Sequence, residues 1–540
     1  MPHTPEVMKT GTLFPILGLL VASLCNSTVG QAGAPIWTNL FSAPLSPYAG
    51  ARTLGTDPAG NIYVVGLYGS YTTSSLATVK FTRNGMPLWT NQYRLTGHEW
   101  NGADSIAVAP NGEVCVTGCS TLTRRGTNQP MFSTLRYSAA GIPLWTNQFK
   151  SACSISTSES NVEGISTTSL DNAGNAYVTS FVSGWSDRTT NDYQVIKFSD
   201  TGVPMWTNRF DGIAHGDDSL ASLKVLPSGH IVVTGSSGGN GGTTEIVTIG
   251  YTSAGLALWT NRFNGAGKNY ASDMGVNESG NIYVLGSSLG MGSSLDYDFL
   301  TLAYTETGVP LWTNRFGKTY GLLEIAKSIA VGGGLISVSG DSQKQGELPG
   351  TFDIATTAYT TAGIPIWTNT YSPNDGLVHN DTACSVTIDP AGNSYVTGTT
   401  TLPGEFAEPD WVTMGYSSTG IPLWTNWFGN FYPGYYDEPS QTVTDSDGNV
   451  IVTGRQQVSA NNSINNFASV IIKYAGASPS PILLSIQSAG QDLILSWPDN
   501  RFSLQSAPAA TGVFGTIAGA SNPYTNSPGQ SEKFFRLVAQ

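Results

Sequence analysis

The sequence has little charge. Lys and Arg together number 24 and Asp and Glu 37 among 540 residues, so 11% of the chain is charged and the net charge is −13. An average soluble domain contains roughly 25% charged residues. Because no basic excess is present to neutralise phosphates, nucleic acid is excluded as the expected partner.

Histidine and cysteine are also scarce, with five of each. The sequence contains no His-x-x-x-His or Cys-x-x-Cys pair, and therefore no conventional zinc site. Two Gly-x-Ser-x-Gly matches, at 235–239 and 286–290, follow β-like runs and lack the helix that a nucleophile elbow requires. We predict no metal and no cofactor, and the sequence favours a non-catalytic protein without deciding the matter.

Long apolar runs are absent except near the N-terminus. Lys9 precedes the run 13–24, LFPILGLLVASL, which is followed by small and polar residues up to Ala34. This run is shorter than the ~20 residues of a spanning helix, so residues 1–32 are predicted to be a signal peptide cleaved after Ala32. A lipoprotein signal at Cys25 is the alternative. The chain is expected to be secreted or exposed at the cell surface, with no transmembrane segment.

Glycine is abundant, with 63 residues, and 40% of the chain is hydrophobic, which is enough for a large core. The dominant feature is internal repetition. A Trp-Thr-Asn triplet, usually preceded by Gly, an aliphatic residue, Pro and another aliphatic residue, occurs eight times. The triplets begin at Trp37, Trp89, Trp145, Trp206, Trp259, Trp312, Trp367 and Trp424.

Two further markers repeat in the same order. A turn followed by a β-rich run is clearest at 57–66, DPAGNIYVVG, and a short strand ending in an aromatic residue is clearest at 299–304, FLTLAY. Each marker occurs eight times, so each period of 50 to 60 residues holds four short strands, a, b, c and d. Four-stranded units repeated in this way predict an all-β, eight-bladed β-propeller.

The phase of the repeats predicts how the ring closes. The first strand d, at 35–41, has no a, b or c before it, and the last a-b-c set, ending at Tyr474, has no d after it. Pairing these orphans completes eight blades over residues 35–475 and removes an open sheet edge. The recurring Trp is interpreted as interblade packing, because a ligand-binding residue has no reason to recur in every blade.

The Asp-x-x-Gly-Asn-x-Tyr-Val-x-Gly element and the Gly-x-x-x-Trp strand resemble the bacterial β-propeller repeat family known as SBBP repeats. The resemblance covers residues 35–475 and implies the scaffold, since that family shares a fold rather than a reaction. Quinone-binding propellers also carry such a Trp, but the adjacent Cys-Cys pair of those proteins is missing from this sequence.

The repeat markers end at Tyr474. Residues 476–481, GASPSP, read as a short linker, and residues 482–540 contain β-like runs that predict a small β-sandwich-like module. These runs resemble short C-terminal modules of secreted bacterial proteins. Attachment, sorting and plain spacing are all open roles for the module.

The b–c and d–a connections vary in length while the a–b and c–d turns are nearly uniform, so binding residues are expected at the end of the ring that carries the variable loops. Acids and aromatics gather there, and they suit a carbohydrate or an extracellular protein. The candidate binding residues are Trp100, Asp104, Asp218, Tyr270, Asp273, Tyr432, Tyr436 and Asp437. A polysaccharide-active enzyme that uses these carboxylates, or a structural cell-surface protein, is the alternative. The propeller is expected to be monomeric.

Four cysteines remain beyond the signal peptide. Cys119 follows strand b and Cys153 follows strand d of the second blade, on the same side, so these two can form a disulfide in an exported protein. Cys115 and Cys384 fall within strands and are interpreted as isolated core residues. The alternative is four unpaired thiols.

Overall fold

The computed structural model describes residues 32–41, 50–69, 74–95, 100–124, 127–150, 154–155, 162–163, 167–183, 191–265, 267–290, 296–317, 321–346, 350–373, 378–401, 409–429, 436–461, 464–477, 485–489, 492–496, 502–507, 515–517, 520, 523–526 and 534–539. Residues 1–31, nearly all of the predicted signal peptide, lie outside this set. So does most of the predicted linker.

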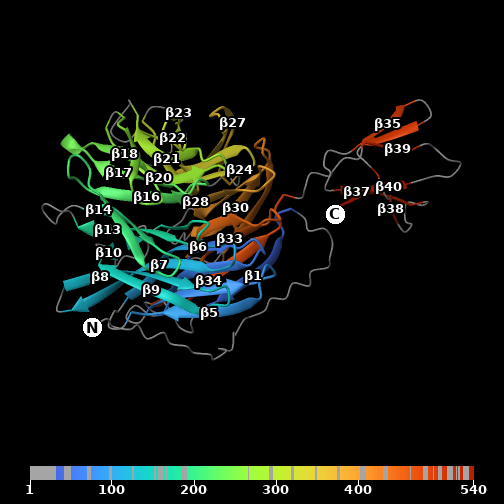
Figure 1. Ribbon diagram of the computed structural model, residues 1–540. Helices are drawn as coiled ribbons and strands as arrows, with labels where there is room; N and C mark the ends of the chain where they lie inside the picture. The colour runs from blue at the N-terminus through green and yellow to red at the C-terminus, as the bar shows by residue number, and fades with distance from the viewer. Residues whose placement is uncertain are drawn as a thin grey trace. The chain divides into compact units, whose positions relative to one another are not determined.

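Eight antiparallel four-stranded sheets form the blades of a propeller, as the sequence predicts (Figure 1). The first four are β2 (Gly50–Thr56), β3 (Ile62–Tyr68), β4 (Ser75–Phe81), β5 (Pro87–Tyr93); β6 (Trp100–Val108), β7 (Val114–Arg124), β8 (Thr127–Tyr137), β9 (Pro143–Lys150); β12 (Thr168–Leu170), β13 (Ala176–Ser183), β14 (Asn191–Phe198), β15 (Pro204–Phe210); β16 (Asp218–Val225), β17 (Ile231–Gly238), β18 (Thr244–Tyr251), β19 (Ala257–Phe263). A two-stranded ribbon, β10 (Ser154–Ile155) and β11 (Val162–Glu163), lies between the second and third blades in the sequence.

The other four blades follow the same order. They are β20 (Asn269–Val276), β21 (Ile282–Leu289), β22 (Tyr297–Tyr304), β23 (Pro310–Phe316); β24 (Glu324–Gly332), β25 (Leu335–Gln343), β26 (Phe352–Thr360), β27 (Pro365–Tyr371); β28 (Asn380–Ile388), β29 (Ser394–Thr401), β30 (Pro409–Tyr416), β31 (Pro422–Phe428); β32 (Asp437–Thr444), β33 (Val450–Asn461), β34 (Ile464–Tyr474), β1 (Pro35–Phe41).

The first strand of every blade lies at the centre of the ring. These strands contact one another in a closed circuit, β2 to β6, β12, β16, β20, β24, β28, β32 and back to β2. We call them inner strands, and the fourth strand of each blade the outer strand. The b–c and d–a connections emerge at one end of the ring, the loop face, and the a–b and c–d turns at the other, the turn face.

The N-terminal strand closes the ring. β1 pairs antiparallel with β34, from Pro35 opposite Tyr474 to Phe41 opposite Ser469. Gly33 N donates to Ala475 O over 2.9 Å and Ala475 N donates to Ala34 O over 2.8 Å, so this segment takes the place of a c–d turn. The closure predicted from the orphan strands is confirmed.

The Trp-Thr-Asn triplets join neighbouring blades. In seven of them the Trp Nε1 donates to a carbonyl in the c–d turn of the next blade, as Trp259 does to Glu306 O over 3.0 Å. The triplet Asn also donates its Nδ2 to a turn glycine carbonyl of the next blade, and this bond recurs at all eight interfaces. The pairs are Asn39 and Gly85, Asn91 and Gly141, Asn147 and Gly202, Asn208 and Gly255, Asn261 and Gly308, Asn314 and Gly363, Asn369 and Gly420, Asn426 and Gly33.

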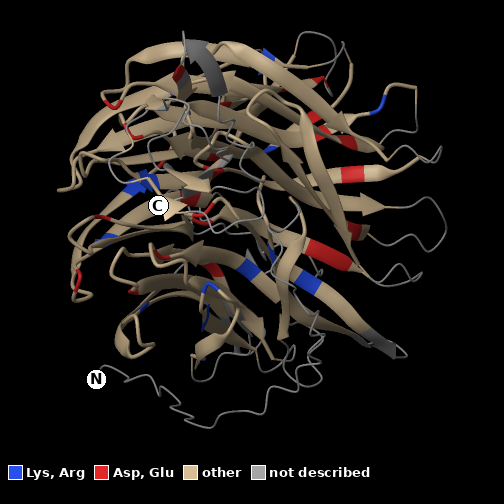
Figure 2. Cartoon of the chain, turned by 90° about the vertical axis from the view of Figure 1, so that its right-hand side faces the viewer, with Lys and Arg blue, Asp and Glu red and all other residues tan. Residues whose placement is uncertain are grey.

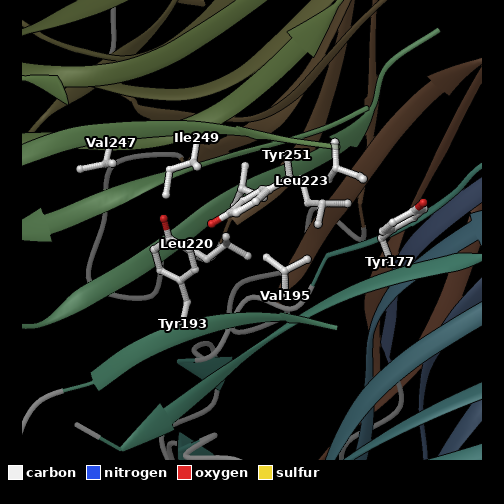
Figure 3. Packing of buried hydrophobic residues seen from close by; sticks show 10 residues of the cluster. Tyr177, Tyr193, Val195, Leu220, Leu223, Val247, Ile249 and Tyr251 are labelled. Atoms are coloured by element: carbon white, nitrogen blue, oxygen red, sulfur yellow. The ribbon is translucent and has the colours of Figure 1, made fainter. Parts of the chain in front are cut away.

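Apolar side chains fill the space between blades. Figure 3 shows Tyr177, Tyr193 and Val195 of the third blade facing Leu220, Leu223, Val247, Ile249 and Tyr251 of the fourth. Alternating residues of b and c strands are buried on both faces because each blade is covered on both sides, which explains their near-continuous Val, Ile and aromatic runs.

The Asp-x-x-Gly-Asn turns have a structural role. Asp57 Oδ1 accepts from Ala59 N and Asn61 N, and its Oδ2 accepts from Tyr63 OH over 3.0 Å. In the eighth blade the equivalent turn, 445–449, has two acids, Asp445 and Asp447, and Asp445 forms an ion pair with the buried Lys473 over 2.7 Å.

The cysteines fall into two classes. Cys119 forms a disulfide, so the alternative of four unpaired thiols does not hold. Its predicted partner, Cys153, lies outside the described residues, and that pairing stays a prediction. Cys115 and Cys384 are free thiols, and burial raises the pKa of each to about 12.

Residues 477–540 form a second unit. It contains one sheet of β35 (Ser485–Ala489), β36 (Asp492–Ser496) and β39 (Tyr524–Asn526), and another of β38 (Gly515–Thr516), β37 (Phe502–Ala507) and β40 (Phe534–Ala539). Leu495 and Leu504, one from each sheet, are buried together in the core. Within the described part of the whole chain, no helix has the length and apolarity to cross a membrane.

Candidate functional site

The inner strands share a β-bulge. In seven of them the pairing with the second strand skips one residue, and a bulge of this kind turns a side chain away from its regular direction. The skipped residues are Arg52, Asp104, Ala221, Ser272, Lys327, Cys384 and Ser440. Equivalent positions of the inner strands therefore carry side chains that differ in size and charge.

The residue after the bulge connects consecutive inner strands. At five interfaces its side-chain oxygen accepts a backbone N–H from the next inner strand. The acceptors and donors are Ser105 and Thr168, Asp273 and Ile329, Ser328 and Val386, Ser385 and Thr442, Gln441 and Leu54, over 2.8–3.3 Å. Asp273, a predicted binding residue, thus has a structural role. Burial raises the pKa of its carboxyl group, opposed by Lys224 and by these hydrogen bonds.

The bulges of the first two blades bring opposite charges together. Arg52 on β2 interacts electrostatically with Asp104 on β6. Burial raises the pKa of Asp104 to about 7, although Arg52 opposes the shift. The Oδ2 atom of Asp104 is buried and has no hydrogen-bond partner among the described residues. One carboxylate oxygen beside a guanidinium is therefore unused by the fold.

The eighth blade adds an aromatic and charged group beside this pair. Glu438 Oε2 accepts from Arg455 Nε over 3.1 Å and forms an ion pair with Arg455 Nη2 over 2.8 Å, while Tyr436 OH donates to Glu438 Oε1 over 3.2 Å. The Arg455 guanidinium lies over the rings of Tyr436 and Phe467, 5.2 and 4.8 Å from their centroids.

Arg52 interacts both with Asp104 of the second blade and with the charged residues of the eighth blade. Burial lowers the pKa of Arg52, Asp104 and Glu438 oppose the shift, and the like charge of Arg455 adds to it. We call Arg52, Asp104, Tyr436, Glu438 and Arg455 the entrance cluster, because they lie on or beside inner strands toward the loop face. Its side chains are partly accessible, with Arg455 and Glu438 exposing 18% and 35%.

Two of the predicted binding acids are buried instead. Asp218 exposes 1% of its surface, and its Oδ2 accepts from Gly212 N over 2.7 Å, fastening the d–a loop to the start of β16. Asp437 exposes nothing and accepts from Gln457 N over 2.8 Å. In both cases the carboxylate holds local backbone in place rather than facing solvent.

Of the three remaining candidates, the structure describes the side chain of Tyr270 alone. Tyr270 is 40% exposed, and its ring lies 6.1 Å from that of Tyr297 in the same blade. Trp100 begins β6 opposite Thr121, and only its backbone is described. Tyr432 lies outside the described residues. Of the eight predicted residues, the structure thus places Asp104 and Tyr436 in the cluster.

Three carboxylates offer the nearest approach to a metal site within the described residues. Ligand atoms of Asp192, Asp211 and Asp218 lie within 4.8 Å of one another. Asp192 is paired with Arg209, and Asp211 contacts His215 Nδ1 over 2.8 Å. The group is therefore already engaged by Arg209 and by hydrogen bonds within the protein.

Arg52, Glu438 and Arg455 were not predicted. A signal for Arg52 was present, because aligning the inner strands of the repeats sets Arg52, Asp104 and Lys327 at one position where other blades carry Ala, Ser or Cys. Arg455 and Glu438 carry no such signal, since their pairing depends on the register of β32 against β33.

Charged residues are sparse over the ring as a whole (Figure 2). No protein-family profile and no curated protein matches this sequence. Solved structures similar to it include a puromycin hydrolase (11% identity, TM-score 0.38, 79% of this chain and 62% of that one) and Sqt1 from Chaetomium thermophilum (8%, 0.43, 81% and 100%). Another is the polysaccharide lyase Uly1 (12%, 0.35, 83% and 91%). The chain spans about three fifths of the puromycin hydrolase it matches, and at these TM-scores the similarities assign no activity to it.

Proposed function

We propose that this protein is an exported binding scaffold that holds a carbohydrate or an extracellular protein at the loop face of its propeller. The observation that supports the proposal is the entrance cluster. It combines two guanidinium groups, two carboxyl groups and a tyrosine ring, contributed by three neighbouring blades. The resemblance of the repeats to bacterial β-propeller repeat proteins belongs to the same proposal, since it implies a scaffold.

The chemistry of the cluster favours carbohydrate. Arginine and carboxylate side chains form paired hydrogen bonds to vicinal hydroxyl groups, and a tyrosine ring offers a flat apolar face. A uronic acid would in addition place its carboxylate against Arg52 or Arg455.

The test is a polysaccharide array probed with the labelled full chain, including neutral glucans, xylan, alginate and pectate. We expect at least one polysaccharide to bind, and Arg52→Ala and Tyr436→Ala each to weaken that binding about tenfold or more. The control is Arg83→Ala, which removes an exposed arginine at the turn face. Binding that survives both cluster variants would place the site elsewhere. Binding to proteins on a protein array, with no binding to any polysaccharide, would favour an extracellular protein as the partner.

A second candidate function is cleavage of an extracellular polysaccharide. It is favoured by Asp104, because a carboxyl group with a pKa of about 7 is partly protonated at neutral pH, as a general acid must be. Incubating any bound polysaccharide with the protein and assaying reducing ends separates the two functions. Release of reducing ends that is lost in Asp104→Asn would establish the enzyme, and binding without product would reject it.

A further inference from the structure

The exposed apolar residues of the ring are concentrated in one place. Among the described residues, twenty-one large apolar side chains are exposed, and fifteen of them come from the segment that precedes the Trp of the repeat. Seven end a c–d turn: Met86, Ile142, Val203, Leu256, Val309, Ile364 and Ile421. Eight are the second residues of outer strands: Ile36, Leu88, Leu144, Met205, Leu258, Leu311, Ile366 and Leu423.

These fifteen residues, here the apolar belt, run around the ring at its turn face. Their exposed fractions range from 37% to 68%. Blade packing does not require them, because the interblade contacts are made by the neighbouring Trp and Asn. The proline between the two belt positions is also exposed in six of the seven blades that carry it, for example Pro87 and Pro310, whereas Pro143 is partly buried.

Copying of one ancestral repeat does not by itself explain why the belt positions are apolar in every blade. Its two positions hold Met, Ile, Val or Leu in different blades, so side-chain shape varies while apolar character is kept. The sixth residue of the same outer strands, also at the surface, holds Leu, Gln, Arg, Thr or Trp. Hydrophobicity is thus retained at the belt positions and not at a comparable position of the same strand.

The size of the belt matches that of a stable protein interface. A fully exposed aliphatic side chain presents roughly 100 Å² of apolar surface, so fifteen at these exposures present on the order of 800 Å². Two such belts in contact would bury about 1,600 Å², the usual size of a specific interface.

We propose that the belt is the contact surface for a second copy of this chain, turn face against turn face. A second ring has the same diameter and the same eightfold spacing of apolar residues, so it meets all parts of the belt at once. The arrangement is isologous, as in most homodimers, and it leaves both loop faces free. A dimer in solution would replace the monomer expected from the sequence.

Charge argues against a lipid surface as the occupant. With a net charge of −13, the protein is repelled by anionic headgroups. The seven c–d turns contain three charged residues, Arg83, Asp200 and Glu306. Arg83 pairs with Asp447, and Glu306 lies 3.1 Å from His230, so the turn face has no basic patch within the described residues.

The test is sedimentation velocity of the full chain at 1–100 µM. We expect a dimer that strengthens with added salt, because salt screens the repulsion between two acidic copies and leaves apolar contact intact. The variant Ile142→Thr/Val203→Thr/Val309→Thr/Ile364→Thr should raise the dissociation constant at least a hundredfold without lowering the melting temperature. The matched control, Ile213→Thr/Val378→Thr/Val458→Thr, changes exposed apolar residues outside the belt and should leave the dimer unchanged.

Three outcomes would overturn the proposal. The first is a wild-type monomer at 100 µM. The second is a dimer dissociation constant that is the same for the belt variant and the control variant. The third is a monomeric wild type that floats with phosphatidylcholine vesicles while the belt variant does not. This result would assign the belt to lipid binding. None of these readouts depends on the polysaccharide proposed for the loop face.

Discussion

Asp104 carries a specific pH dependence at the scale of single residues. Its pKa is 3.8 as a free side chain and about 7 in the fold. Between these values the folded chain keeps a proton that the unfolded chain releases, so the free energy of unfolding falls as pH rises from about 4 to about 7. Asp104→Asn imitates the protonated form at every pH.

We therefore expect Asp104→Asn to match the wild type near pH 4 and to exceed it at pH 8 by roughly 1–3 kcal/mol. Urea unfolding across this pH range measures the difference. Asp200→Asn, an exposed acid in a c–d turn, controls for the loss of one negative charge. A constant offset between Asp104→Asn and the wild type at all pH values would show that Asp104 ionises normally.

The c–d turn glycines have two separate requirements. Gly308 has φ +80, and a Cβ there would overlap the Trp259 ring of the preceding blade. Gly229, in an a–b turn, has φ +83 with nothing within 4 Å of such a Cβ. Both substitutions by Ala incur backbone strain, but only Gly308→Ala also disturbs an interblade contact.

We expect Gly308→Ala to lower the unfolding free energy by about 1–3 kcal/mol more than Gly229→Ala does, since overpacking adds to the shared strain. Chemical denaturation of the two variants is the measurement. Equal losses would mean that the turn can move away from the Trp without cost.

The N-terminal strand is the element on which the ring most depends. Without β1, β34 has a free edge and the Asn426 bond to Gly33 O is lost. Deleting residues 33–41 should lower the melting temperature by more than 10 °C or cause aggregation. A synthetic peptide of residues 33–41, added in excess, should restore part of the loss, and a scrambled peptide should not. An unchanged melting temperature in the deletion variant would refute the closure.

The sequence predicted these elements well and the site poorly, for one physical reason. Strand order, blade number and closure follow from residue patterns that recur eight times, so each error in one repeat is corrected by the others. Arg52 and Arg455 occur once each, on different blades, and their proximity depends on bulges and register. Asp218 and Asp437 were misjudged because acids beside aromatics in a loop look alike in sequence whether they face solvent or hold backbone N–H groups.

At the scale of the whole molecule, the two units differ greatly in the size of their cores. Among the described residues, the ring has nine clusters of buried apolar residues, such as the one in which Tyr177 packs with Leu223 of the next blade. The core of the second unit centres on Leu495 and Leu504. Small domains bury proportionally less surface and are less stable.

Calorimetry should therefore show two transitions, with the unit at 477–540 melting first. Limited proteolysis should remove this unit before it cuts the ring, and mass spectrometry of the products identifies the order. A single transition, with simultaneous loss of both units, would mean that the second unit is stabilised by contacts with the ring.

Ring closure also means that two paired strands are synthesised far apart in time. β1 is made first, and its partner β34 is made roughly 430 residues later, as the pairing of Phe41 with Ser469 shows. At about 5–20 residues per second, translation of that interval takes on the order of 20–90 s. Throughout this time β1 has no native partner, while blades formed in between already expose the belt. A chain released early would therefore lack the eighth blade, leave β1 unpaired and expose the belt residues of the blades already formed.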